Sequence, residues 1–298
     1  MGRVLLITNP AAARTDPAVV RTVSTVLGRE GWDVDVVGTT RPGHAAELAA
    51  AGVRDGADVV AVYAGDGTTM QAVKGLQGHD VPLALIPGGT GNLLAGNLRV
   101  PRDPAKAALV IARGVPRAID LGSVARADGT HFFAVVSGAG FDAEWMASTT
   151  TEAKRRWKFA AYVAQGWGKI SHVRNVPYRI TVDGAVLEGE AATAMVANCG
   201  EFVPPLLKFG PGVALDDGVF DVLILSAEGF LESVGVAIHL IGGAGDTHSG
   251  IRLARGRVVQ VEMDPPQPVQ LDGDVIGETP FTAELLPGGL SVLVPRAG

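Results

Sequence analysis

The first 120 residues of the chain alternate short apolar runs with segments of helical periodicity. The apolar runs are rich in β-branched residues and predict four strands, at Val4–Thr8, Val34–Val37, Val59–Tyr63 and Leu83–Ile86. Between and after these runs, apolar residues recur three or four positions apart, which predicts helices at Pro17–Arg29, His44–Ala51, Thr69–Leu76, Leu93–Leu98 and Pro104–Ala112. Buried strands that alternate with helices indicate a parallel sheet covered on both faces.

Beyond Leu121 the pattern changes to short strand-like runs, many of them separated by Asp-Gly or Pro-Gly. These runs are Phe132–Val136, Tyr178–Val182, Ala191–Ala197, Phe220–Leu225, Val258–Met263, Phe281–Leu285 and Ser291–Val294. Such a pattern is typical of an antiparallel sandwich or barrel, here interrupted by two helical patches at Thr151–Ile170 and Gly229–Leu240. We therefore expect an α/β domain over residues 1–120 and a β-sandwich domain over residues 121–298.

Composition narrows the classes of partner. Of the 298 residues, 47% are hydrophobic and 19% are charged, which favours a packed core over disorder. The formal net charge is −6, and this sign disfavours a nucleic-acid binder that works by phosphate neutralisation. A single cysteine, Cys199, excludes an internal disulfide framework. The N-terminal apolar run is too short for a signal-peptide core, and no run reaches the roughly 18 apolar residues of a membrane-spanning helix.

Candidate chemistry begins where the third predicted strand ends, at Gly65-Asp66-Gly67-Thr68. A strand, a glycine turn and a helix together present backbone N–H groups and a positive dipole end to an anion. A carboxylate beside such a site suits phosphates that arrive with Mg²⁺. The same residues also suit an ordinary turn that caps a helix, and this segment alone leaves both interpretations open.

A second glycine-rich turn, Pro87-Gly88-Gly89-Thr90-Gly91-Asn92, follows the next predicted strand, and Asn9-Pro10 follows the first. Because the carboxyl ends of parallel strands meet at one edge of a sheet, these turns are expected to converge on one ligand. The P-loop pattern is missing, and the dinucleotide fingerprint is not convincing.

In this order, the motifs resemble those of the soluble diacylglycerol kinase-like lipid kinases, over nearly the whole chain. The resemblance rests on Asn9-Pro10, Gly65-Asp66-Gly67-Thr68, Pro87–Asn92, Gly138-Ala139-Gly140-Phe141-Asp142, Leu215-Asp216-Asp217-Gly218-Val219-Phe220 and Asp272-Gly273-Asp274. The Gly-Asp-Gly-Thr motif is shared with NAD kinases, whereas the other motifs are specific to the lipid branch. The family's fold is an α/β domain with a parallel sheet followed by a β-sandwich, with the active site in the cleft between the domains.

The resemblance implies roles for individual residues. ATP is expected at Asn9, Thr39, Gly65, Asp66, Gly67, Thr68, Gly89, Thr90 and Asn92. Asp272 matches the family's proton acceptor, and Asp274 stands where a glutamate usually assists it. In a rival assignment Asp66 is the base instead of orienting Mg²⁺ and phosphate. Asp217, with the main-chain carbonyls of Ala214 and Val219, matches a structural metal site.

The acidic turns also have an ordinary interpretation, because Asp128-Gly129 and Asp183-Gly184 sit between strand-like runs as hairpin turns. By spacing alone Asp272-Gly273 is one more such turn, and only Asp274 and the family position favour chemistry there. The chain also departs from the family pattern: Ala64 replaces a glycine, Gln71 a glutamate, Leu93 an aspartate and Asp274 a glutamate.

A basic and aromatic segment, Lys154-Arg155-Arg156-Trp157-Lys158, stands out in this acidic chain. It suits an amphipathic helix on an anionic bilayer, and equally a helix packed on the sandwich with a solvated basic edge. With the resemblance, we expect a cytoplasmic kinase, peripheral at the inner membrane face, that uses ATP and Mg²⁺ to phosphorylate a lipid hydroxyl, first of all diacylglycerol. The alternatives are a kinase for a soluble alcohol such as NAD and a catalytically impaired nucleotide- or lipid-binding protein. The sequence leaves the oligomeric state open, a homo-oligomer included.

Overall fold

The computed structural model describes residues 2–10, 16–140, 174–199, 201–203, 207–208, 214–226 and 250–296. Contacts divide the chain into two units, residues 1–120 with 287–298, and residues 121–286. Two long strands, β5 (Val115–Arg126) and β18 (Phe281–Val294), each begin in one unit and end in the other. Residues 287–298, which the sequence assigned to the second domain, thus belong to the first unit.

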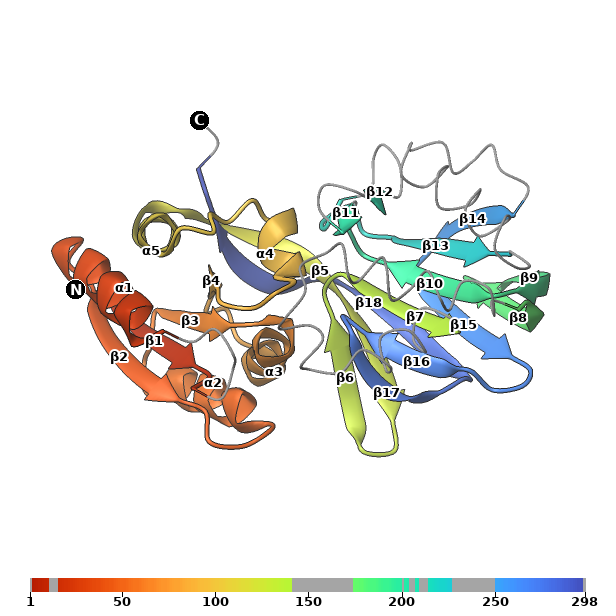
Figure 1. Cartoon of the computed structure of the whole chain (residues 1–298), viewed down its shortest axis with the longest axis horizontal. Helices are drawn as coiled ribbons and strands as arrows, with labels where there is room; N and C mark the ends of the chain where they lie inside the picture. The colour runs from red at the N-terminus through yellow and green to blue at the C-terminus, as the bar shows by residue number, and fades with distance from the viewer. Residues whose placement is uncertain are drawn as a thin grey trace. The chain divides into compact units, whose positions relative to one another are not determined.

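The first unit is built on parallel strands in the order β2-β1-β3-β4 (Figure 1). Their bounds are β1 (Arg3–Thr8), β2 (Asp33–Gly38), β3 (Val59–Ala64) and β4 (Leu83–Pro87). Every residue of β3 is buried, as expected for a central strand covered on both faces. The end of β18 adds to this sheet beside β4, where Val292 pairs with Leu83 in parallel.

Three helices connect these strands: α1 (Pro17–Arg29), α2 (His44–Arg54) and α3 (Asp66–Leu76). After β4 come α4 (Leu93–Asn97) and α5 (Pro104–Arg113), which lead to β5. Figure 1 shows α1 and α5 on one face of the sheet and α2 and α3 on the other. The sequence begins α1 and α5 in the same way, with an aspartate whose side chain accepts a first-turn amide and a proline directly after it. Those aspartates are Asp16 and Asp103.

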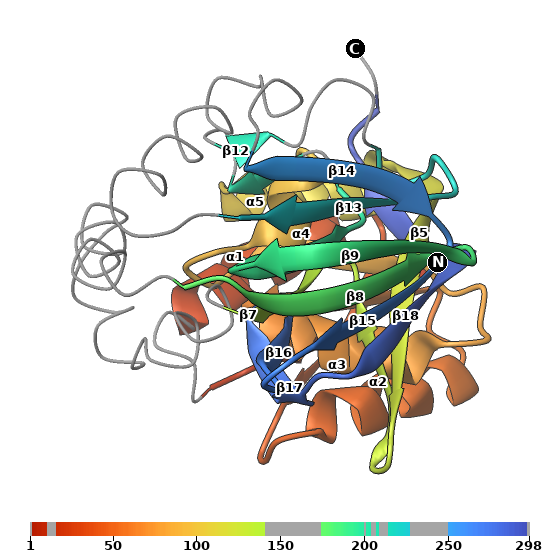
Figure 2. The same ribbon diagram turned by 90° about the vertical axis from the view of Figure 1, so that its right-hand side faces the viewer.

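The second unit is a sandwich of antiparallel strands, as predicted. One sheet has the order β14 (Ile251–Gly256), β13 (Phe220–Leu225), β10 (Thr193–Ala197), β7 (Val136–Gly140), β16 (Pro268–Leu271) and β17 (Asp274–Glu278). The other places β15 (Val258–Met263), β8 (Val176–Val182) and β9 (Ala185–Ala191) beyond β18, and also contains β5 and β6 (Gly129–Phe133) (Figure 2). A short ladder joins β11 (Glu201–Val203) to β12 (Leu207–Lys208).

The core of the sandwich lies between its two sheets. Phe133 from β6 stacks on Phe220 from β13, with ring centroids 5.5 Å apart, and both side chains are fully buried. Along β8 the buried and exposed positions alternate, which places Tyr178, Ile180 and Val182 in the same core. Burial of these large apolar surfaces holds the two sheets together.

The α/β domain, the sandwich and every predicted element of the first 120 residues are confirmed, with bounds shifted by a few residues. Three predicted strands of the second domain are wrong in detail. The run Phe132–Val136 is broken between β6 and β7, because amides there bond to a side chain instead of a neighbouring strand. The runs Phe281–Leu285 and Ser291–Val294 are a single strand, β18. The predicted helices Thr151–Ile170 and Gly229–Leu240 lie outside the described residues.

Candidate active site

The predicted nucleotide residues of the first unit gather at the carboxyl edge of its parallel sheet. Asn9 follows β1, Thr39 follows β2, Gly65 follows β3 and Gly88 follows β4. The strand order runs outward from β1 to β2 on one side and to β3 and β4 on the other. Open α/β sheets bind ligands at the carboxyl ends of their strands, where the order reverses in this way.

Polar contacts join the first three of these turns. The Asn9 side-chain amide donates to the Thr68 hydroxyl across 3.1 Å, and the Thr39 backbone N–H donates to the Thr8 carbonyl across 2.8 Å. Gly65 begins α3 without a side-chain cap, so the first-turn amides of that helix have neither an intrahelical partner nor a capping side chain from Gly65. This helix N-terminus has the geometry that binds phosphate.

The two glycine-rich turns touch backbone to backbone. A Cβ atom on Gly89 would lie 2.6 Å from the Cα of Gly65 and 3.1 Å from the Asn92 Oδ1. The Gly88 N–H also donates to the Ala64 carbonyl across 3.0 Å. Only glycine at position 89 therefore lets the turns come this close.

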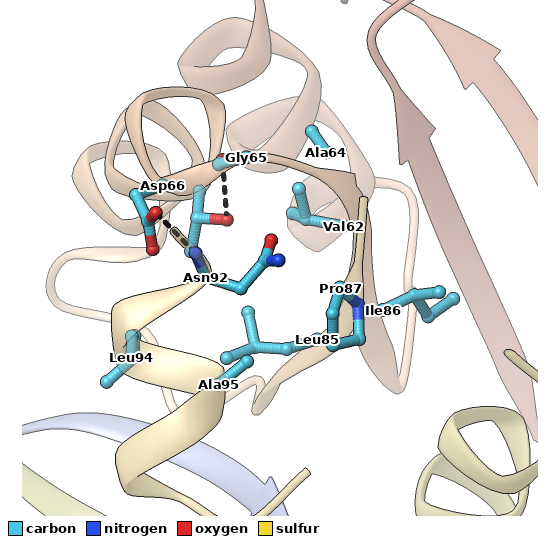
Figure 3. A pocket seen from close by; sticks show the side chains of 11 residues that line it. Val62, Ala64, Gly65, Asp66, Leu85, Ile86, Pro87, Asn92, Leu94 and Ala95 are labelled. Atoms are coloured by element: carbon cyan, nitrogen blue, oxygen red, sulfur yellow. Dashed lines mark hydrogen bonds between the residues drawn. The ribbon is translucent and has the colours of Figure 1, made fainter. Parts of the chain in front are cut away.

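Asn92 and Asp66 lock the two turns together (Figure 3). The Asn92 side chain accepts from the Gly89 N–H and donates to the Gly89 carbonyl, both across 2.8 Å. The Asp66 carboxylate accepts the backbone N–H groups of Asn92 and Leu93, each across 2.8 Å. Burial raises the pKa of Asp66, and the amides that donate to its carboxylate oppose the rise.

The space beneath the turns is small. A cavity of about 10 Å³, lined by residues that include Asp66, Pro87 and Asn92, lies between β3, β4 and α4. A cavity of this size is at the lower limit for one water molecule. The cavity is therefore too small for a nucleotide, whereas Thr90 and Gly91 of the second turn are exposed to solvent.

Gln71, which replaces the family's glutamate, ties the turn after β2 to α3. Its side-chain carbonyl oxygen accepts the Gly43 N–H across 3.0 Å, and Gly43 begins α2 in a left-handed conformation. Within that turn, the Thr40 N–H donates to the His44 Nδ1 across 3.1 Å. An amide oxygen thus accepts here as a carboxylate oxygen would.

In the second unit, Asp272 and Gly273 form the turn between β16 and β17. Both have positive φ, 47° and 96°, and Leu271 pairs with Asp274 across the turn. The Asp272 carboxylate accepts three backbone N–H groups at 2.8 to 3.0 Å, from Ala134, Val135 and Val136. Asp274, at the start of β17, is exposed.

The Asp183-Gly184 turn between β8 and β9 repeats this arrangement. Both residues again have positive φ, 47° and 87°. The Asp183 carboxylate accepts the Arg257 and Val258 N–H groups at 2.9 to 3.1 Å. Asp183 has no expected catalytic role, yet its carboxylate holds a neighbouring chain segment in the same way as that of Asp272. Such contacts are therefore structural and do not by themselves indicate chemistry.

Two buried polar side chains behind the Asp272 turn were not predicted from the sequence. The Gln270 side-chain oxygen accepts the Gly273 N–H across 2.7 Å, and the Asn198 amide donates to the Ala134 carbonyl across 3.1 Å. Each side chain is only 1% exposed. Polar residues within apolar runs were the available signal, because a buried polar group needs a partner.

The predicted metal residue Asp217 contacts an arginine. One carboxylate oxygen accepts the Val219 N–H across 3.2 Å, and the other lies 2.8 Å from the Arg255 guanidinium. Arg255 also contacts Asp221, the residue opposite it on β13. Burial raises the pKa of Asp221 more than Arg255 lowers it. Among the described residues, no three His, Cys, Asp or Glu side chains converge on a possible metal position.

Every helix within the described ranges is too short or too polar to cross a bilayer. The segment Lys154–Lys158, predicted to meet a membrane, lies outside those ranges.

Comparison with known proteins identifies the family. The family described as "Diacylglycerol kinase catalytic domain" matches residues 3–124, and "YegS C-terminal NAD kinase beta sandwich-like domain" matches residues 134–294. The chain belongs to the diacylglycerol kinase-like lipid kinases.

Relatives along the whole length agree with this family. A diacylglycerol kinase of Mycobacterium tuberculosis is 30% identical, covering 100% of this chain and 97% of its own length. A diacylglycerol kinase of Bacillus subtilis is 28% identical, with coverage of 99% and 97%. A crystal structure of a candidate diacylglycerol kinase from Bacillus anthracis covers 99% of this chain and 97% of its own, with a TM-score of 0.79 at 25% identity. Membership of this kinase family implies a phosphotransferase that uses ATP, typically with a divalent metal ion.

Proposed function

We propose that this protein transfers the γ-phosphate of ATP to the hydroxyl group of a lipid, and that diacylglycerol is the acceptor and phosphatidate the product. The observation that carries the proposal is the joined pair of glycine turns, locked by Asp66 and Asn92, in a chain of a lipid kinase family. The relatives named diacylglycerol kinase support the choice of acceptor.

The first unit holds the nucleotide in this proposal. Phosphate oxygens can approach the uncapped N-terminus of α3 and the glycine backbone at Gly65, Gly67 and Gly89. Polar side chains of the same edge come from Asn9, Thr39, Thr68, Thr90 and Asn92. Mg²⁺ fits here as well, because Asp66 places a carboxylate, a hard oxygen donor, at the start of α3 beside the proposed phosphate position. When bound, the ion would neutralise charge on the phosphoryl group in transfer.

The second unit supplies the carboxylate that accepts the hydroxyl proton. Asp272 and Asp274 share one hairpin, and their geometry favours a division of labour. Three amides already engage the Asp272 carboxylate, so its oxygens are held by the backbone of residues 134–136. We therefore assign proton acceptance to Asp274, with Asp272 as the residue that fixes the hairpin. Two rival assignments, with Asp272 or Asp66 as the base, must be excluded by mutagenesis.

A carboxylate, with a reference pKa of about 4, is a weak base. It suffices in this reaction because phosphoryl transfer depends mostly on positioning and on charge stabilisation. The hairpin is well suited to positioning, since Gln270 and the Asp272 contacts fix the backbone on both sides of Gly273.

The departures from the family pattern are compatible with activity. Gln71 keeps an acceptor for the Gly43 N–H, and Leu93 uses its backbone, not its side chain, to bond Asp66. Ala64 likewise contributes its carbonyl. These contacts weigh against an impaired nucleotide-binding protein.

The lipid is reached at a bilayer surface, and we assign the membrane contact to Lys154, Arg155, Arg156, Trp157 and Lys158. Basic and aromatic side chains bind the headgroup level of an anionic membrane. Flotation with anionic vesicles should recover the wild type and lose the Arg155→Glu/Arg156→Glu double variant, while neutral vesicles recover neither. Equal recovery of both proteins on anionic vesicles would place the contact elsewhere.

The proposed function is tested by incubating the protein with ATP, Mg²⁺ and a total lipid extract, followed by mass spectrometry of the products. We expect phosphatidate to accumulate at the expense of diacylglycerol. Accumulation of another lipid phosphate would correct the acceptor, and the absence of any new lipid phosphate would refute lipid kinase activity.

A further inference from the structure

The Asp217 turn is the place where the structure and the family resemblance disagree. The resemblance implies a structural metal ion held by the Asp217 carboxylate and the carbonyls of Ala214 and Val219. A divalent ion of the Mg²⁺ or Ca²⁺ kind needs six or more oxygen ligands close around it. In this chain an arginine lies against the only carboxylate in that ligand set, 2.8 Å from its Oδ2.

Arg255 makes three contacts with two carboxylates. Its Nε lies 3.0 Å from the Asp221 Oδ1, its Nη2 lies 3.2 Å from the Asp221 Oδ2, and the same Nη2 lies 2.8 Å from the Asp217 Oδ2. The first two contacts form the fork that a guanidinium makes with one carboxylate. The third extends the fork to the turn before β13.

The pairing of β13 with β14 places Arg255 beside Asp221. Asp221 and Arg255 are directly opposite each other on the antiparallel pair β13 and β14, where oppositely charged side chains stabilise the pairing. The side chains of Asp217 and Asp221 are only 21% and 16% exposed, whereas that of Arg255 is 51% exposed. The arginine thus covers two partly buried carboxylates from the solvent side.

A second arginine bonds the same turn. Arg257, which follows β14, donates its Nε–H to the Gly218 carbonyl across 3.0 Å. Asp217 and Asp221 together carry two negative charges, and Arg255 and Arg257 bring two positive charges to them. A divalent cation at the Asp217 carboxylate would meet the guanidinium of Arg255, which repels it.

We propose that Arg255 replaces the structural metal ion of the family in this chain, so that the Asp217 turn folds without a divalent cation. The guanidinium supplies the positive charge and, unlike an ion, is delivered by the strand that pairs with β13. The proposal is independent of the acceptor of the kinase reaction.

Thermal unfolding of the nucleotide-free full chain, in EDTA and in millimolar Mg²⁺, tests the proposal. We expect the wild type to unfold at the same temperature in both solutions. We expect Arg255→Met to unfold about 2–4 °C lower in both, because two partly buried carboxylates lose their partner. The matched control is Arg179→Met, which removes an exposed cross-strand pair with Glu188 and should leave the midpoint nearly unchanged.

Asp217→Asn gives a second test, which also serves if Arg255→Met does not fold. The proposal expects this variant to lose the same number of degrees in EDTA and in Mg²⁺. A bound structural metal instead predicts a wild-type midpoint that rises with Mg²⁺ and a variant that does not respond. That pattern, or an Arg255→Met midpoint equal to that of Arg179→Met, would overturn the proposal.

Discussion

Asp66 accepts the backbone N–H of Asn92 across 2.8 Å, a contact between residues 26 positions apart that joins the two glycine turns of the first unit. The bond connects the start of α3 to the start of α4, and the neighbouring N–H of Leu93 doubles it. The carboxylate of the Gly-Asp-Gly-Thr motif therefore shapes this edge of the sheet through backbone contacts, which any residue except proline can provide at position 93.

The raised pKa of Asp66 predicts a pH dependence of stability. Because the folded protein holds this proton more tightly than the unfolded chain, the Asp66 contribution to the free energy of unfolding falls as pH rises through the range just above its usual pKa of 3.8. Asp66→Asn removes that titration. Chemical unfolding from pH 3.5 to pH 6 should show the wild type losing stability relative to the variant; an unchanged difference would contradict the raised pKa.

Gly89→Ala should separate the glycine turns. The new methyl group would lie 2.6 Å from the Gly65 Cα, so the backbone must shift, at a cost of about 1–3 kcal/mol in the free energy of unfolding. Nucleotide affinity, measured by calorimetry, should fall at least tenfold.

The control for this variant is Gly28→Ala, at an exposed position of α1 where a Cβ meets no atom within 4 Å. It should stabilise the protein slightly, because alanine favours a helix, and leave nucleotide affinity unchanged. Equal nucleotide affinities of Gly89→Ala and the wild type would show that contact between the turns is not needed for binding.

Substitutions of the two hairpin aspartates should have different effects on kcat and on stability. Asp274→Asn is expected to lower kcat at least 100-fold with little change in the unfolding midpoint, because the residue is exposed and, in our assignment, takes the proton. Asp272→Asn should lower both kcat and stability, because an amide nitrogen cannot accept the N–H groups of residues 134–136.

Asp183→Asn separates the structural part of this effect, since Asp183 makes the same kind of contacts in the same kind of turn. It should lower stability and leave kcat unchanged. Full turnover by Asp274→Asn would reject it as the base, and loss of turnover in Asp66→Asn at undiminished nucleotide affinity would favour Asp66.

Substitution of Gln71 should change the KM for ATP and leave the KM for the lipid unchanged. Gln71→Ala removes the acceptor of the Gly43 N–H, a hydrogen bond worth about 1 kcal/mol, and loosens the turn that carries Thr39. We expect KM for ATP to rise roughly fivefold with KM for the lipid unchanged. Gln71→Glu keeps an acceptor and should behave as the wild type; equal KM values for ATP in both variants would exclude this role.

The sequence predicted the first unit well because its strands end in turns rich in glycine and proline. Two of its helices also begin with a clear N-cap residue, at Asp16 and Asp103. It also predicted which turns share one edge, since parallel strands decide that. The break between β6 and β7 was not predictable, because it depends on Asp272, more than 130 residues further along the chain. The strands β5, β9, β14, β16 and β17 were missed, because backbone hydrogen bonds to neighbouring strands, and not an apolar pattern of their own, form them.

Some contacts of the candidate site could likewise be predicted from the sequence, and others could not. Glycines and aspartates in turns were visible as motifs, whereas Gln270 and Asn198 act through single hydrogen bonds to distant backbone. Arg255 was invisible for a similar reason, because only the β13–β14 register places it opposite Asp221.

The most direct test of the account is the transfer of labelled γ-phosphate from ATP, with diacylglycerol in anionic vesicles and NAD offered together as acceptors. The account predicts that label enters the organic phase as phosphatidate, and that Gly89→Ala and Asp274→Asn each abolish most of it. Label found in NADP alone, or ATP that stays intact with every lipid supplied, would contradict it.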